Sequence, residues 1–439
     1  MIKQDLTQGD VGKHLYAMAL PMTWGILSIM SMNIVDTFYV SRLGTDPLTA
    51  MSFTIPIVSI LLSLAFGIGI GTSSVIARAI GAQEEELVKS YATQSLFIAL
   101  TVAITFAVLG YHYMDAIFSL LGAPPALFPL IHDFMDIWFL GSFVVVVPMV
   151  GNSAIRASGN AKIPSFVMIS VAIVNIILDP IFIFGMFGFP RMELAGAALA
   201  TVISYSIALV IGLYFLAYKL RFLSWNGCFH QVAQSWKAIL RIGIPAIGTN
   251  LIAPISIAMT TWLVARNNPE AVAGFGVASR IESICIVVMM ALSSIMGPFV
   301  GQNWGAGHTT RVSSALKISY RFVTIWGIGI TLLLGLFGSS IVSLFTADPI
   351  VSSSAVVYLW LVPVTYMFLG IIMIASSAAN GTGDPKPSLV MSFMRLVGLY
   401  LPLALGLNYY MGLNGIYLAT AIANALVGIG ALRWSRVLA

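Results

Sequence analysis

The segment SVAIVNIILDPIFIFGMFGF, residues 170–189, places one acidic residue, Asp179, in the middle of an apolar run. Asn175 stands four residues before this acid, and Pro180 follows it directly. A run of about 20 mostly apolar residues is the length that an α-helix needs to cross the hydrocarbon core of a bilayer. The segment therefore predicts a transmembrane helix with a carboxyl group where charge is costly.

The composition extends this prediction to the whole chain. Of its 439 residues, 59% are hydrophobic and only 8% are charged, whereas a soluble domain carries about 25% charged residues. This composition indicates an all-α polytopic membrane protein that lies in a lipid bilayer. The net charge of +5 comes from basic residues scattered singly between apolar runs, so we expect no nucleic-acid partner. Cys228 lies in a polar connector and Cys285 in an apolar span, which argues against a disulfide framework.

Apolar segments of membrane-spanning length recur along the chain, and the N-terminus lacks the short apolar region of a cleaved signal peptide. The sequence predicts twelve spans, near residues 15–40, 48–76, 91–112, 128–150, 163–187, 194–218, 236–264, 272–300, 314–342, 353–379, 388–409 and 414–434.

The distribution of Lys and Arg predicts how these spans are oriented. With a cytoplasmic N-terminus, sixteen basic residues fall on the inside, and only Arg42, Arg191 and Arg266 fall on the outside. Cytoplasmic loops carry an excess of Lys and Arg in membrane proteins. We therefore expect both termini to be cytoplasmic.

An internal repeat appears when the sequence is shifted by 224 residues. The aligned pairs are Pro21 with Pro245, Arg42 with Arg266, Gly81 with Gly305, Gly159 with Gly383 and Lys162 with Lys386. Each half holds six predicted spans, an even number, so the repeat is parallel and its axis follows the membrane normal. We expect a six-helix bundle over residues 1–219, a cytoplasmic linker over 220–235 and a second six-helix bundle over 236–439, around a central cleft.

Acidic residues inside predicted spans are candidates for function, because a charge at the centre of a bilayer costs about 2.5–3.5 kcal/mol on insertion scales. Asp36 lies in the first span and Asp179 in the fifth. Asn175 and Asp179 are four apart and share one helix face, while Pro180 leaves one carbonyl without its helical donor. Such oxygens suit a proton relay or a Na⁺ ion. In the alternative structural interpretation, Asp179 only caps a kink or bonds to a neighbouring helix, and Asp36 pairs with Arg42 near the lipid headgroups.

The eighth span carries the third acid, Glu282, two residues after Arg280. Residues two apart on a helix do not face one another, so we expect a partner elsewhere, with Arg395 as the candidate. A buried ion pair that holds the second bundle together is as good an interpretation as a role in transport. The repeat shift aligns Asp36 with Thr260 and Asp179 with Leu403, which concentrates the ionisable chemistry in the first bundle.

Five motifs in this order make the chain resemble the multidrug and toxic compound extrusion (MATE) family, in the branch named for DNA-damage-inducible protein F. They are ALP with NIVDTFYVSRLG in the first span, ARAIGAQ after the second, IRASGNAKIPS before the fifth, VNIILDPIFIFG within it, and ANGTGDPKPS after the tenth. The resemblance covers essentially the whole chain.

The resemblance implies a secondary antiporter in the cytoplasmic membrane of a bacterium or archaeon. Such a protein exports amphipathic, often cationic organic compounds in exchange for H⁺ or Na⁺, and needs no cofactor beyond that ion; we expect a monomer. The positions that match the ion pocket of this branch are Asp36, Asn175, Asp179 and Thr201. Pro21 matches the proline at which the first helix is proposed to bend on protonation.

Other functions fit less well. A flippase for lipid-linked oligosaccharides, of the same superfamily, usually needs basic residues in the cleft, and only Arg280 and Arg395 qualify. A major-facilitator transporter would carry a different motif after the second span. A membrane enzyme would need a metal or nucleophile cluster, and none of the five histidines forms a pair with metal-ligand spacing. A passive channel would not require buried acids beside prolines, although the sequence leaves it open.

Overall fold

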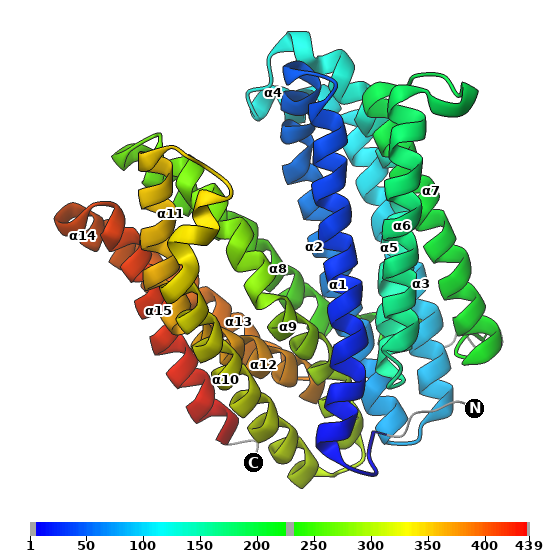
Figure 1. The fold of residues 1–439 in the computed structure, drawn as a ribbon. Helices are drawn as coiled ribbons and strands as arrows, with labels where there is room; N and C mark the ends of the chain where they lie inside the picture. Colours follow the sequence, from blue (N-terminus) through cyan, green and yellow to red (C-terminus); the bar gives the residue numbers. More distant parts are fainter. Residues whose placement is uncertain (1–5, 225–231, 437–439) are drawn as a thin grey trace. The chain divides into compact units, whose positions relative to one another are not determined.

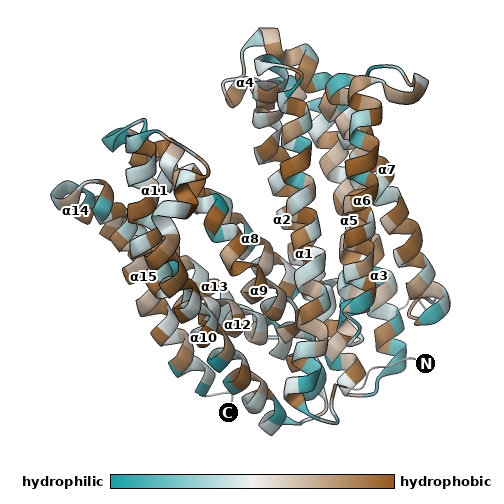
Figure 2. Ribbon diagram, viewed as in Figure 1, coloured by the Kyte–Doolittle hydropathy of each residue, from teal (hydrophilic) through white to brown (hydrophobic). Residues whose placement is uncertain are grey.

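The structure is a computed structural model that describes residues 6–224 and 232–436. Its described residues contain twelve helical segments long and apolar enough to cross a membrane, as predicted. Hydrophilic residues gather toward the ends of the helices and apolar residues run along their middles (Figure 2). Cys228 and the centre of the predicted linker lie outside the described residues.

The chain forms two compact units, each a group of helices lying side by side (Figure 1). Within the described part, the first unit is Leu20–Ile247, and the second unit combines Leu6–Ala19 with residues from Gly248 onward. The first helix of each half, α1 (Val11–Ser41) and α8 (Val232–Asn267), therefore begins in one unit and ends in the other. This exchange differs from the predicted division, because contiguous sequence segments do not show where a long helix changes its packing partners.

Helix α5 is central to the first unit and contacts α2, α3, α6 and α7. The helices are α2 (Thr45–Gly81), α3 (Glu85–His112), α4 (Met114–Leu120), α5 (Phe128–Ala157), α6 (Lys162–Phe184) and α7 (Glu193–Tyr214). Close approach depends on glycine: a Cβ at Gly69 would lie 2.6 Å from the Ser153 hydroxyl of α5. Turn residues 125–127 precede α5, and a π turn, η3 (Phe215–Lys219), follows α7.

The second unit is organised around α9 and α12, which contact one another. Its helices are α9 (Ala271–Gly305), α10 (Thr309–Ser343), α11 (Pro349–Leu361), α12 (Tyr366–Thr382), α13 (Lys386–Phe393), α14 (Leu401–Met411) and α15 (Leu413–Ser435). The tenth predicted span is broken between α11 and α12, where Pro363 lacks the N–H group that a continuous helix would use. The eleventh is broken by the π turn η5 (Met394–Tyr400), which ends just before Pro402.

Local geometry supports the internal repeat. Gly159 and Gly383 have φ angles of 89° and 90°, in the left-handed region that favours glycine. Arg42 lies 4.8 Å above the ring of Phe38, and its repeat mate Arg266 lies 5.0 Å above the ring of Trp262. The two halves therefore share their turns and their helix ends as well as the order of their spans.

The contact between α2 and the first part of α8 gives a test of the fold. A Cβ at Gly71 would lie 2.4 Å from the Ile239 carbonyl oxygen, and neither backbone can retreat easily. We expect Gly71→Ala to destabilise the protein by about 1–3 kcal/mol, as overpacking does. Thermal unfolding of the purified protein in detergent would measure this. The matched control is Gly329→Ala, because a Cβ at Gly329 meets no atom within 4 Å; equal unfolding midpoints for the two variants would contradict this packing.

Candidate ion-coupling site

The structure brings Asp36 of α1 and Asp179 of α6 together within the first unit, close enough for their carboxyl groups to interact. Asp179 is completely buried, and Asp36 is half-buried. Asp36 Oδ1 and Asp179 Oδ2 are both buried and accept no hydrogen bond from another donor in the structure. Two like charges close together disfavour one another, so we expect one of the two carboxyl groups to carry a proton.

Asn175 links this acid pair to α7. Its Nδ2 lies 3.4 Å from Asp179 Oδ1 and 3.4 Å from Thr201 Oγ1. The Thr201 hydroxyl in turn donates to the Ala197 carbonyl at 3.1 Å. Asn175 is completely buried, and its Oδ1 has no hydrogen-bond donor in the structure. The four predicted residues therefore form one continuous polar group between α1, α6 and α7.

Local sequence explains how these helices present the group. The four-residue spacing of Asn175 and Asp179 places both on one face of α6, which runs unbroken through Pro180 and ends at Gly185 with φ 75°. Gly25 lets α1 approach α6 closely, since a Cβ there would lie 3.1 Å from the Ser165 Cα. The small residue on α1 thus brings the helix that carries Asp36 against the helix that carries Asp179.

Tyr205 is a further member that the sequence prediction missed. It lies four residues after Thr201, on the same face of α7, and interacts electrostatically with Asp36. The spacing from Thr201 was the available signal, but an aromatic residue in an apolar span is usually ordinary packing.

The alternative pairing of Asp36 with Arg42 is not present among the described residues. The Arg42 guanidinium lies instead over the Phe38 ring, four residues before it on α1. The partner of Asp36 is therefore Asp179.

The predicted ion pair of the second unit is also not present within the described ranges. Glu282 Oε2 accepts a hydrogen bond from the Tyr358 hydroxyl at 2.5 Å. Arg395 interacts with Glu282 electrostatically but forms no ion pair with it, and Arg280 is exposed. A tyrosine hydroxyl therefore makes the hydrogen bond to Glu282, while Arg395 lies in the π turn η5.

At the repeat-equivalent position, the second unit has a neutral contact. Thr260, the mate of Asp36, lies on α8 with its Oγ1 2.6 Å from the Tyr400 hydroxyl. Nearby, the Asn267 Nδ2 donates to Asn408 Oδ1 at 2.7 Å. These groups join α8 to the eleventh span without a carboxyl group.

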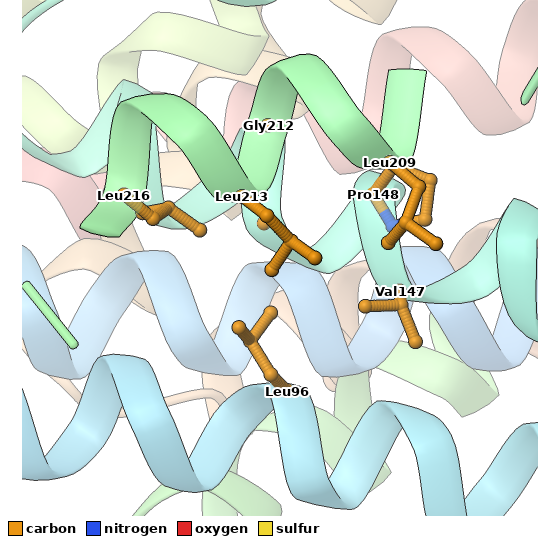
Figure 3. A pocket seen from close by; sticks show the side chains of 8 residues that line it. Leu96, Val147, Pro148, Leu209, Gly212, Leu213 and Leu216 are labelled. Carbon is orange, nitrogen blue, oxygen red and sulfur yellow. The ribbon is translucent and has the colours of Figure 1, made fainter. Parts of the chain in front are cut away.

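An apolar pocket of the first unit lies apart from this chemistry (Figure 3). It lies between α3, α5 and the end of α7, and its lining is Leu96, Val147, Pro148, Gly151, Leu209, Gly212, Leu213 and Leu216. No titratable side chain lines it, so it offers no group for ion coupling.

The carboxyl contact predicts a spectroscopic signature. We expect Asp36 and Asp179 to share one proton, so infrared spectra of the purified protein at neutral pH should contain a C=O stretch from a protonated carboxyl group. We expect this band to disappear on deprotonation at high pH, and to be missing or shifted in both Asp36→Asn and Asp179→Asn. Glu270→Gln, at an exposed residue, is the control. A spectrum that neither first-unit variant alters would contradict the shared proton.

Comparison with known proteins places this geometry in a family. The MatE family model matches residues 21–181 and 245–405, and the two matches begin and end 224 residues apart, as the repeat does. A Shewanella oneidensis protein named FAD transporter is 38% identical over 97% of this chain and 95% of its own. A Bacillus subtilis protein named probable multidrug resistance protein YoeA is 26% identical over 94% of this chain and 90% of its own.

Solved structures agree. A mutant of the Vibrio cholerae MATE transporter VcmN superposes with a TM-score of 0.94 at 30% identity, covering 98% of this chain and 97% of its own. The same transporter in a form described as bent superposes with a TM-score of 0.92. With both halves matched by the family model, and with relatives and structures that extend over nearly its full length, this chain belongs to the MatE family of membrane transporters.

Proposed function

We propose that this protein exports organic compounds by antiport, and that Asp36 and Asp179 carry the coupling ion. The observation that supports this most strongly is the proximity of the two carboxyl groups, in each of which one buried oxygen lacks a hydrogen-bond partner. A pair of this kind holds a proton in one state and loses it, or exchanges it for Na⁺, in another. Members of the family are transporters and not enzymes, so a titrating pair has a clear use here.

The proposed coupling step is a change in the contact between α1 and α6. With one shared proton the two carboxyl groups attract each other; without it they repel, because two charges in a low-dielectric site interact strongly. α1 would respond at Pro21, where the missing N–H group weakens the helix. A structure described as a bent form, known for a transporter 30% identical to this chain, is consistent with such bending.

H⁺ is our first choice of ion, and Na⁺ is the second. Both carboxyl groups, the Asn175 carbonyl oxygen and the Thr201 hydroxyl could supply oxygen ligands to Na⁺, which is a hard cation. Loss of the proton would be needed for Na⁺ to enter, so the two ions would compete for one site.

Replacing either acid should abolish transport. We expect Asp36→Asn and Asp179→Asn to reduce ethidium uptake into everted membrane vesicles, in which the cytoplasmic face is outside, to background. The reason is that the amide keeps the shape of the side chain but cannot titrate. Glu270→Gln should transport normally at an equal amount of protein in the membrane. An imposed pH gradient and an imposed sodium gradient, applied separately, distinguish the coupling ions. Efflux that persists in both aspartate variants would rule out the proposed role.

Flavin adenine dinucleotide is the second compound to test. The relative named FAD transporter is more similar to this chain than the multidrug relatives, which are 23–27% identical. FAD is amphipathic but anionic, unlike the cationic compounds that the sequence led us to expect. We predict that proteoliposomes containing the protein accumulate FAD under a pH gradient and that Asp179→Asn removes this uptake. Transport of ethidium but not of FAD would support the multidrug function and exclude FAD as a substrate.

A further inference from the structure

Within the second unit, one arginine makes several hydrogen bonds to the segment that precedes α1. Arg311, in the first turn of α10, donates from Nη1 to the Gly9 carbonyl at 2.7 Å. Its Nη2 donates to the Leu6 carbonyl at 2.9 Å and to the Gln8 carbonyl at 3.0 Å. Its Nε donates to Asn303 Oδ1 at 2.9 Å. A single guanidinium thus makes three of its four hydrogen bonds to the backbone of residues 6–9, which we call the N-terminal clamp segment.

Neighbouring amides complete the clamp. Asn303, fully buried at the end of α9, donates to the Leu6 carbonyl at 3.2 Å. Gln302 Oε1 accepts from the Leu6 backbone N–H at 3.3 Å. The Leu6 side chain has no exposed surface. The contact therefore combines a buried apolar side chain with hydrogen bonds to the backbone groups of an irregular segment. Together these hold the segment more firmly than the hydrogen bonds of one exposed arginine would.

Directly after the clamp segment, α1 changes units. Residues up to Ala19 belong to the second unit, and residues from Leu20 belong to the first. Pro21 lies next to this change, and Asp36 lies beyond it, in the first unit. The N-terminal end of α1 is thus fixed to one body and its acid-bearing part to the other, with the weakest point of the helix between them.

α8 repeats the arrangement with a different kind of contact. It changes units after Ile247, close to Pro245, the repeat mate of Pro21. Its first part is held in the first unit by backbone contact with α2: a Cβ at Gly67 would lie 2.3 Å from an Ile247 side-chain atom and 2.9 Å from the Gly243 carbonyl. Its last part is joined to the second unit by the neutral Thr260 contact. The start of α8 also makes polar contacts, because Trp236 Nε1 donates to Gln94 Oε1 at 2.9 Å and Ser235 Oγ lies 3.0 Å from Ser90 Oγ. Of these two helices, as far as the structure describes them, α1 is the one whose later contact includes a carboxyl group.

We propose that Arg311 is a positioning residue for transport, which anchors the N-terminal end of α1 so that a change at Asp36 bends the helix at Pro21. Without the anchor, α1 would respond to the same change by shifting as a whole, and the bend would be lost. This inference rests on the proposed role of Asp36. Arg311 itself touches neither the substrate nor the ion.

Kinetics of Arg311→Ala should separate turnover from binding. We expect kcat for ethidium efflux driven by a pH gradient to fall about tenfold or more, which corresponds to a barrier increase of about 1.4 kcal/mol. KM should stay within about twofold, because the substrate site is unchanged. Arg311→Lys should recover part of kcat, since an ammonium group keeps the charge and up to three donors. Arg321→Ala, an exposed arginine on the same helix, is the control and should transport normally.

A distance measurement tests the anchor without relying on transport. Spin labels at Lys13→Cys on α1 and Lys317→Cys on α10, both exposed, report the separation of two elements within the second unit. Cys228 and Cys285 are replaced by serine for this purpose. We expect one short distance in the wild type and a broader, longer distribution in Arg311→Ala, measured by electron paramagnetic resonance.

Three results would overturn the proposal. An unchanged distance in Arg311→Ala would show that Arg311 does not hold the segment. A lengthened distance with wild-type kcat would show that the anchor is not used in transport. A raised KM with unchanged kcat would point to substrate binding instead. If Asp36→Asn transported normally while the distance lengthened as expected, the coupling role would fail and the clamp would stand as a structural contact alone.

Discussion

The contact between two carboxyl groups in the low-dielectric interior of the first unit is the constraint on which the rest of the account depends. A charge on both groups at once is costly there, and a shared proton removes most of that cost. Asp179 is completely buried, with Asn175 and Thr201 arranged beside it. Replacing a buried charged pair with apolar residues is often neutral or stabilising, which supports our proposal that this pair is kept for transport.

The two units treat the same position differently. Where the first unit has an acid pair, the second has the Thr260 and Tyr400 hydroxyls at 2.6 Å. Hydroxyls of this kind form a hydrogen bond that does not depend on pH in the physiological range. The internal repeat therefore supplies two similar bundles. In our proposal the first carries a contact that a proton switches, while the corresponding contact of the second is between neutral hydroxyl groups.

Much of this could be predicted from the sequence. Twelve spans and the repeat follow from hydrophobic length and a fixed offset. The cost of buried charge singled out Asp36 and Asp179, whereas Thr201 entered only through the resemblance to the family. The sequence could not show that α1 and α8 change units midway, because that depends on which neighbours a helix packs against. It also could not reveal the role of Arg311, which is one of many basic residues near helix ends until the backbone of residues 6–9 is placed against it. The sequence named Arg395 as a partner of Glu282, and the two interact electrostatically. It could not show that the Tyr358 hydroxyl makes the hydrogen bond, because an aromatic residue in an apolar span gives no such signal.

The most direct test of the central claim is the number of protons released when the exported compound binds. Isothermal titration calorimetry of ethidium binding, repeated in buffers of different ionisation enthalpy, gives this number; FAD replaces ethidium if it is the compound transported. Because substrate and proton would exclude one another, the account predicts release of about one proton from the wild type and of none from Asp36→Asn or Asp179→Asn. Equal proton release from the wild type and from both variants would contradict it.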